Sequence, residues 1–187
     1  KAANEMKERL SELLRRPIGR MWVGTFHSLA HRLLRTHPVE ANLSPTFQIL
    51  DAQDQFRIVK RLMKENGVDE TKFPIKKVQW FINQQKDEGI LPHQIDAGHN
   101  YFVKQSAKIF DLYEKHCQAN DLVDFAGLLV KSYELLKNNQ SLLDHYQKRF
   151  HHILIDEFQD TNRIQYQWIK LLHTQQNHIF CVGDDDQ

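Results

Sequence analysis

Two clusters of acidic residues follow short apolar runs near the end of this 187-residue sequence. The run 153–155 leads directly into Asp156 and Glu157, with Asp160 close behind, and a second apolar run precedes the acids at 184–186. Neighbouring carboxylates can divide a task, since one can hold Mg²⁺ while the other polarises an attacking water molecule. These residues therefore predict metal-assisted hydrolysis, with solvated loop acids as the alternative.

The segments around these acids have the pattern of a strand, a helix and a second strand. Residues 153–155 and 179–182 are fully apolar, and Ile164, Trp168 and Ile169 recur between them at helical spacing. Such strands are typical of a parallel sheet buried on both faces. Because ligands bind at the carboxyl ends of parallel strands, we expect both acidic clusters at one sheet edge. An apolar strand that ends in Asp-Glu is also the Walker B pattern of nucleotide hydrolases.

The rest of the chain is predicted to be mainly helical. The run 21–23 has strand character, but the long middle contains no comparable strand. Apolar spacing, Asp and Thr caps and Pro or Gly stops predict helices over 2–16, after Thr25, after Asp51, from Pro74 to Gly89, and over about 101–119 and 124–138. The sequence therefore predicts α/β pieces at both ends, with a helical insertion between them.

Composition narrows the class of protein. A hydrophobic fraction of 41% and a charged fraction of 26% are those of a soluble globular protein, which excludes disordered and collagen-like chains. No apolar run approaches the ~18 residues that a membrane-spanning helix needs, so we expect no membrane partner. Cys117 and Cys181 do not form a disulfide framework. They indicate a reducing, cytoplasmic location, and we expect both to be buried.

Charge is unevenly distributed, although the formal net charge is only +1. Residues 1–37 are mainly basic, which suits a polyanion, and residues 150–187 are mainly acidic, which suits a divalent cation. The chain begins at Lys1 without an initiator Met and ends at Gln187 without a terminating signal. We therefore expect it to be a piece of a longer protein.

Five segments together resemble the motifs of UvrD/Rep-type superfamily 1 DNA helicases. They are motif II (ILIDEFQDTN, 153–162), the start of motif III (VGDDDQ, 182–187), the GTFHS segment (VGTFHS, 23–28), the end of motif Ia (KAANEM, 1–6) and the DFxxLL element (124–129). The resemblance spans the whole chain, and the segments occur in the family's order.

The resemblance implies a fold and an activity. The fold would be a partial RecA-like parallel-sheet motor domain, 1A, over 1–25 and 151–187, with a mostly helical inserted subdomain, 1B, over 26–150. The parent protein would be an ATP-dependent 3′-to-5′ DNA helicase of DNA repair, which uses ATP and Mg²⁺. Its partners would be single-stranded DNA, duplex or fork junctions, and repair proteins.

The resemblance also assigns the nucleotide site. Asp156 would be the acid associated with Mg²⁺, and Glu157 would lie beside the ion as the base that activates the hydrolytic water. Gln187 would sense the γ-phosphate. Gln159 and Asp160 would couple the nucleotide state to movement.

The candidate DNA-binding residues are Thr25, Phe26 and His27, which the resemblance assigns to the path of the single strand. That assignment agrees with the basic N-terminal region. His27 and His31 also have the spacing of a zinc pair, but Ser28 stands where a metalloprotease has Glu, so we do not predict zinc.

Two parts of the family pattern are absent from the sequence. It contains no G-x-x-x-x-G-K-[ST] phosphate loop and no second motor domain with an arginine finger. Because phosphoryl transfer depends on positioning and charge stabilisation, we expect the chain alone to be inactive as an ATPase. The alternatives are an autonomous DNA- or protein-binding module, and a metal-dependent nuclease that uses the acids at 156–160 and 184–186.

Overall fold

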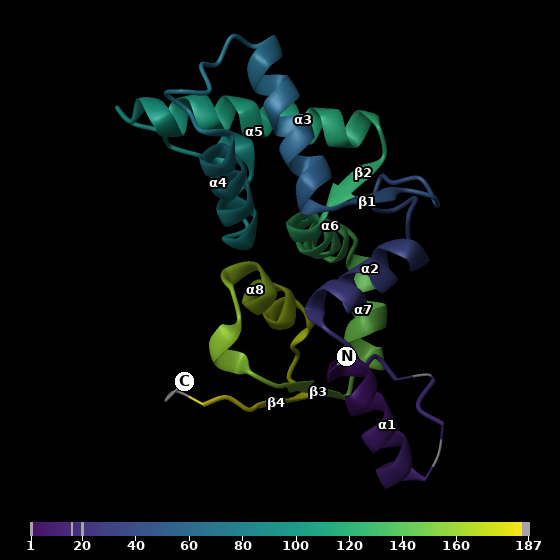
Figure 1. Ribbon diagram of the computed structural model, residues 1–187. Helices are drawn as coiled ribbons and strands as arrows, with labels where there is room; N and C mark the ends of the chain where they lie inside the picture. Colours follow the sequence, from purple (N-terminus) through teal and green to yellow (C-terminus); the bar gives the residue numbers. More distant parts are fainter. Residues whose placement is uncertain (1, 16, 20, 185–187) are drawn as a thin grey trace.

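The computed structural model describes residues 2–15, 17–19 and 21–184 (Figure 1). In chain order the elements are α1 (Ala2–Leu14), α2 (Phe26–Thr36), β1 (Gln48–Leu50), α3 (Ala52–Glu65), α4 (Ile75–Asp87), the 3-10 helix η1 (Pro92–Gln94), α5 (Tyr101–Ala119), β2 (Leu122–Asp124), α6 (Phe125–Asn138), α7 (Gln140–Arg149), β3 (His152–Ile155), the 3-10 helix η2 (Phe158–Asp160), α8 (Arg163–Leu172) and β4 (His178–Cys181). Helices dominate, and the described strands form two parallel pairs. The predicted α/β class is therefore confirmed, whereas its RecA-like character stays a prediction.

The strands on either side of α8 pair as the sequence predicts. β3 and β4 are parallel, with Leu154 opposite Phe180 and Ile155 opposite Cys181. Ile153 packs against the core that includes α8, but Leu154 is 76% exposed and Phe180 is 59% exposed. The expectation of a sheet buried on both faces is therefore wrong for the described chain, because α8 packs on one side of this pair (Figure 1).

The helical middle contains a second, smaller strand pair. β1 and β2 are parallel over three residues each, with Leu50 opposite Asp124. The sequence predicts no strand here comparable to 153–155, and it gives no indication of this shorter pair, because strands of three residues leave no apolar run to detect. The segment 21–23, in contrast, is not a strand. Trp22 instead lies edge-on to Tyr146 and Phe150, with ring centroids 5.3 and 5.5 Å away.

Polar caps begin the predicted helices. The Asp51 carboxylate accepts hydrogen bonds from two backbone amides at the start of α3, both at 2.8 Å. The Thr25 hydroxyl accepts one from the Ser28 amide at the start of α2. These starts are confirmed, but the sequence analysis missed α7. Only Asn139 separates α7 from α6, so the boundary carries no Gly or Pro signal.

The described residues form two apolar cores. One includes buried side chains of α2, α6, α7 and α8, and the other includes those of α3, α4 and α5. Ile164 and Trp168 of α8 belong to the same core as Leu128 and Leu129 of α6. Packing is therefore continuous across residue 150, where the boundary between subdomain and motor domain is predicted.

A buried ion pair joins the second core to α6. The Lys86 ammonium lies 2.7 Å from the Asp124 carboxylate and 2.6 Å from that of Glu114, and the Lys86 and Asp124 side chains are each only 4% exposed. Burial alone would lower the pKa of Lys86, but the two carboxylates raise it above its ordinary value. Burial alone would raise the pKa of Asp124, but Lys86 and hydrogen bonds hold it below its usual range.

Asp124 also collects hydrogen bonds from three other elements. The Tyr113 hydroxyl of α5 and the Gln55 amide of α3 donate to one carboxylate oxygen, at 2.7 and 3.1 Å. The Gly127 backbone amide donates to the other oxygen at 2.6 Å, which caps α6. One carboxylate therefore fixes the start of α6 against α3, α4 and α5.

We predict that Lys86→Met lowers the free energy of unfolding by about 3–5 kcal/mol, because it leaves a buried carboxylate without its counter-charge. The matched control is Lys115→Met, which removes an exposed pair with Asp111 of the same 2.7 Å length and should cost about 0–1 kcal/mol. Urea unfolding of both variants checks this, and equal losses would contradict it.

The two cysteines differ in accessibility. Cys117 is buried, and burial raises its pKa to about 11, whereas Cys181 on β4 is exposed. The prediction that both are buried is therefore wrong for Cys181.

We predict that a thiol reagent modifies Cys181 rapidly in the native protein, and Cys117 only after unfolding, because the thiolate is the reactive form. Rapid labelling of native Cys181→Ser would contradict this.

Candidate functional site

The acids after β3 and Asp184 after β4 lie at one edge of the β3–β4 pair. Beyond the strands, the Val182 amide donates to the Ile155 carbonyl at 2.8 Å, and the Phe158 amide donates to the Val182 carbonyl at 2.9 Å. This pairing brings the loop that starts at Asp156 beside the loop that contains Asp184. The predicted convergence is confirmed for the described residues, while residues 185–187, including Gln187, lie outside them.

The loop after β3 turns sharply at its acids. Glu157 has a φ of +52°, in the left-handed region that non-glycine residues seldom adopt. The Asp156 carboxylate accepts a hydrogen bond from the Glu157 amide at 3.1 Å, and both side chains are exposed. The chain then enters η2, which ends at the exposed Asp160. The turn presents the acids to solvent at the strand end.

Gln159 connects the two loops. Its side-chain amide donates to the Glu157 carboxylate at 2.7 Å, and its carbonyl oxygen accepts from the Asp184 backbone amide at 3.1 Å. The sequence analysis assigned Gln159 to the site, but it gave no indication of these two contacts.

The acids fit a magnesium–nucleotide complex better than a metal site made by protein alone. In the described ranges, no three His, Cys, Asp or Glu side chains are grouped so that they could hold an ion. Mg²⁺ usually keeps several waters and takes one or two carboxylates together with substrate phosphates. Asp156 and Glu157 supply exposed carboxylates of this kind, so they could hold Mg²⁺ together with a nucleotide.

The residues predicted to contact DNA lie elsewhere, at the start of α2. The Thr25 hydroxyl caps this helix, and the half-buried Phe26 lies edge-on to Trp168, with ring centroids 6.3 Å apart. These two side chains therefore have structural contacts of their own. His27 differs, because it lines a hollow of about 510 Å³.

This hollow gathers residues from five parts of the chain. His27 of α2, Gln55 of α3, Asp87 of α4, Phe125 of α6 and Asn162 before α8 all line it. Phe125 is 59% exposed, and its ring lies 5.3 Å from that of His27. The sequence analysis noted the segment of Phe125 as a family motif but missed its place beside His27. It had no signal for Asp87.

Hydrogen bonds of Asn162 connect the loop after β3 to the hollow beside His27. The Asn162 side chain accepts from the Gln165 amide at 3.0 Å, which caps α8, and donates to the Asp87 carboxylate at 2.9 Å. The adjacent residue, Arg163, lies 3.7 Å from Glu88. The loop that begins at the acids therefore ends in contact with the last turn of α4.

Part of the basic N-terminal region has structural contacts. Arg35 donates to the backbone carbonyls of Pro45 and Phe47 at 2.8 and 2.7 Å, and its guanidinium lies 3.8 Å from the centre of the Phe47 ring. Arg32 lies over the ring of Trp22. Both arginines hold neighbouring segments in place, so the basic character of residues 1–37 is a weaker indication of DNA binding than the sequence suggests.

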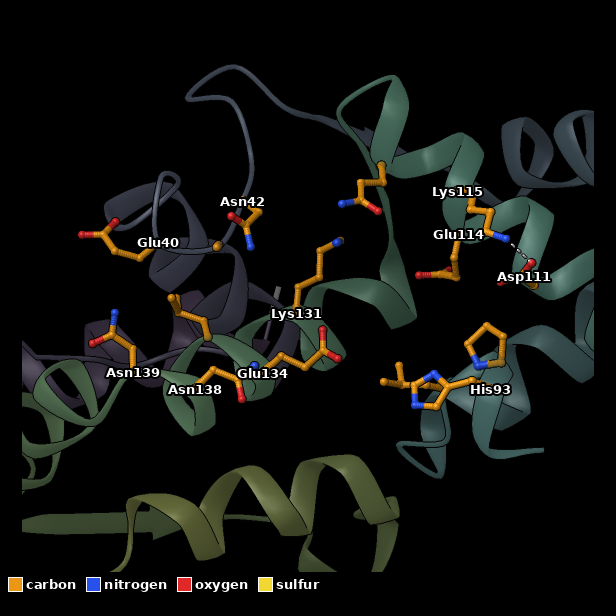
Figure 2. A pocket seen from close by; sticks show the side chains of 15 residues that line it. Glu40, Asn42, His93, Asp111, Glu114, Lys115, Lys131, Glu134, Asn138 and Asn139 are labelled. Carbon is orange, nitrogen blue, oxygen red and sulfur yellow. Dashed lines mark hydrogen bonds and ion pairs between the residues drawn. The ribbon is translucent and has the colours of Figure 1, made fainter. Parts of the chain in front are cut away.

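A second hollow, of about 430 Å³, is lined in part by α5 and α6 (Figure 2). Glu114 of α5 and Glu134 of α6 line it, with Lys131 nearby. Burial raises the pKa of Glu134, although Lys131 opposes the shift. No residue assigned by the sequence analysis lies there, and Lys115 at its rim is paired with Asp111.

Comparison with known proteins identifies the family. The family model described as the UvrD/REP helicase N-terminal domain matches residues 1–187. The chain belongs to the UvrD/REP helicase family.

Individual UvrD/REP relatives align with the whole chain. DNA helicase II of Escherichia coli (strain K12) is 50% identical over 187 residues, and that of Haemophilus influenzae is 47% identical over 191. The ATP-dependent DNA helicase PcrA of Bacillus subtilis is 34% identical over 189 residues. In each case all of this chain is covered, but it spans only 25–26% of the relative's length. In the described part of this family member, no helix is long and apolar enough to cross a membrane.

Burial shifts the pKa of both His27 and Asp87, and the charge of each residue partly reverses the shift of the other. Burial lowers the pKa of His27 from 6.5, and the charge of Asp87 raises it in part. We predict that Asp87→Asn lowers the pKa of His27 further, because the carboxylate no longer stabilises the imidazolium. An NMR titration of the imidazole checks this, with Asp111→Asn as the control that should leave His27 unchanged. A rise in its pKa in Asp87→Asn would contradict the prediction.

Proposed function

We propose that this chain is part of an ATP-dependent DNA helicase that moves 3′-to-5′ along single-stranded DNA and unwinds duplexes during DNA repair in the cytoplasm. The names of the relatives, DNA helicase II and PcrA, support the proposal. The observation that carries it is the contact between Asn162 and Asp87, because it connects the paired acidic loops to the hollow beside His27.

In the proposed nucleotide site, Asp156 and Glu157 face the phosphates of ATP. Mg²⁺, when bound, would neutralise charge that develops on those phosphates. Glu157 orients the attacking water and accepts its proton, since an exposed carboxylate at a strand end can reach a bound nucleotide. Gln159 and Asp160 couple this site to movement, and Gln187 senses the γ-phosphate.

In the proposed DNA site, a single strand passes the hollow beside His27. The exposed Phe125 ring offers a face on which a base can stack, which is how proteins hold unpaired strands without reading sequence. Thr25 and Phe26 support this surface from the start of α2. Asp87 lies on the same side and keeps phosphates away from the hollow, so bases rather than phosphates would enter it.

The proposed organisation is domain 1A over 1–25 and 151–187 and subdomain 1B over 26–150. We also propose that the 187 residues alone do not hydrolyse ATP, since the sequence contains no G-x-x-x-x-G-K-[ST] loop to cradle the phosphates. Fork junctions and repair proteins are the remaining proposed partners.

The second candidate function is a DNA-binding module without catalysis. It is favoured by one observation, which is that His27, Phe125 and Asn162 line one hollow within this chain. Fluorescence anisotropy of the chain with labelled single-stranded and forked DNA tests it. Binding that weakens steeply with salt, and weakens in Phe125→Ala, would support the module.

We predict that Glu157→Gln, in the longer protein that contains this chain, lowers DNA-stimulated ATP hydrolysis by about 100-fold or more, because the water loses its general base. Binding of ATP should persist. The matched control is Glu70→Gln on an exposed loop, which should keep full activity. A fully active Glu157→Gln protein would contradict the assignment, and Mg²⁺-dependent cleavage of DNA without nucleotide would indicate a nuclease instead.

A further inference from the structure

The Gln159 side chain joins the loop after β3 to the loop after β4. One end of its amide donates to Glu157 Oε2 at 2.7 Å, and the other end accepts from the Asp184 backbone amide at 3.1 Å. β3 and β4 are parallel and end at the same edge of the pair, so the Gln159 amide spans the gap between the loops that follow them. Gln159 is half-buried, whereas the Glu157 carboxylate is exposed.

The space for this amide depends on Gly183. A Cβ atom at this position would lie 2.5 Å from Gln159 Oε1, which is closer than real contacts allow. The backbone of Gly183 does not have a positive φ, so its conformation does not require glycine. A side chain at this position would instead displace the Gln159 amide from its present place.

The Gln159 amide restricts the direction of the Glu157 carboxylate. An exposed Glu side chain has several rotamers, and holding it in one of them costs conformational entropy. The hydrogen bond from Gln159 fixes one carboxylate oxygen and leaves Oε1 available to a reacting molecule.

We propose that Gln159 is a positioning residue, which holds the Glu157 carboxylate in its working direction and ties it to the backbone of the segment after β4, at Asp184. The proposal rests on the proposed role of Glu157 as the base of ATP hydrolysis. Its consequence is that a displacement of the segment after β4 changes the direction of the base. Gly183 keeps the space that this connection needs.

Three variants of the longer protein separate the two contacts. Gln159→Met has a similar length and loses both hydrogen bonds. Gln159→Glu retains an acceptor for the Asp184 amide but cannot donate to Glu157, and it places a second carboxylate beside it. Gly183→Ala keeps Gln159 but displaces its amide. Gln176→Met, the same change on an exposed loop before β4, is the matched control.

Two measurements test the proposal. Hydrogen exchange of the Asp184 amide should accelerate in Gln159→Met and Gly183→Ala, but not in Gln159→Glu or Gln176→Met. DNA-stimulated turnover should fall about 10- to 100-fold in all three test variants, since misplacing a catalytic group by about 1 Å has effects of this size. The KM for ATP should change little, because Gln159 is not proposed to bind the phosphates of ATP.

The outcomes distinguish a failure of the proposed function from a failure of the positioning role of Gln159. If the wild-type longer protein shows no DNA-stimulated ATP hydrolysis, the proposed function fails, while hydrogen exchange still decides whether Gln159 holds the β4 loop. If the wild type is active and Gln159→Met keeps its turnover number, the positioning role is overturned. Unchanged exchange at Asp184 in Gln159→Met would overturn the connection to β4.

Discussion

The buried pair of Lys86 and Asp124 is the constraint on which the arrangement of this chain depends. Two charges inside a protein are tolerated only with close partners, and here Tyr113, Gln55 and the start of α6 complete the set around Asp124. These partners come from α3, α4, α5 and the start of α6, and Gln55 and Lys86 lie 69 and 38 residues before Asp124 in the sequence. The pair therefore fixes where α6 begins, and with it the exposed Phe125 beside His27.

From that fixed point, contacts continue to the end of the parallel strands. Asp87 follows Lys86 at the end of α4 and receives a hydrogen bond from Asn162, which closes the loop that starts at Asp156. In the proposed helicase, these contacts connect the nucleotide site to the hollow beside His27. Stability and function then share one set of residues, and a loss of the buried pair affects both proposed sites.

The sequence predicts those features that local pattern determines. The helices 101–119 and 124–138 and the strand–helix–strand unit have clear apolar spacing, and the acids at the strand ends follow from it. The apolar run 21–23 wrongly predicts a strand. Its Trp22 packs against Tyr146 in the core and takes no part in strand pairing. The contacts of Gln159 with Asp184 and of Asn162 with Asp87 span 25 and 75 residues, so no local pattern could reveal them.

The central claim is that the contact between Asn162 and Asp87 couples the two proposed sites. The most direct measurement is the affinity of the longer protein for single-stranded DNA, with and without a non-hydrolysable ATP analogue, in wild type and in Asn162→Ser. Serine retains a cap for α8 but cannot reach Asp87 as asparagine does. The account predicts that the nucleotide changes DNA affinity in wild type and has little effect in Asn162→Ser, which still binds DNA. An equal nucleotide effect in both proteins would contradict it.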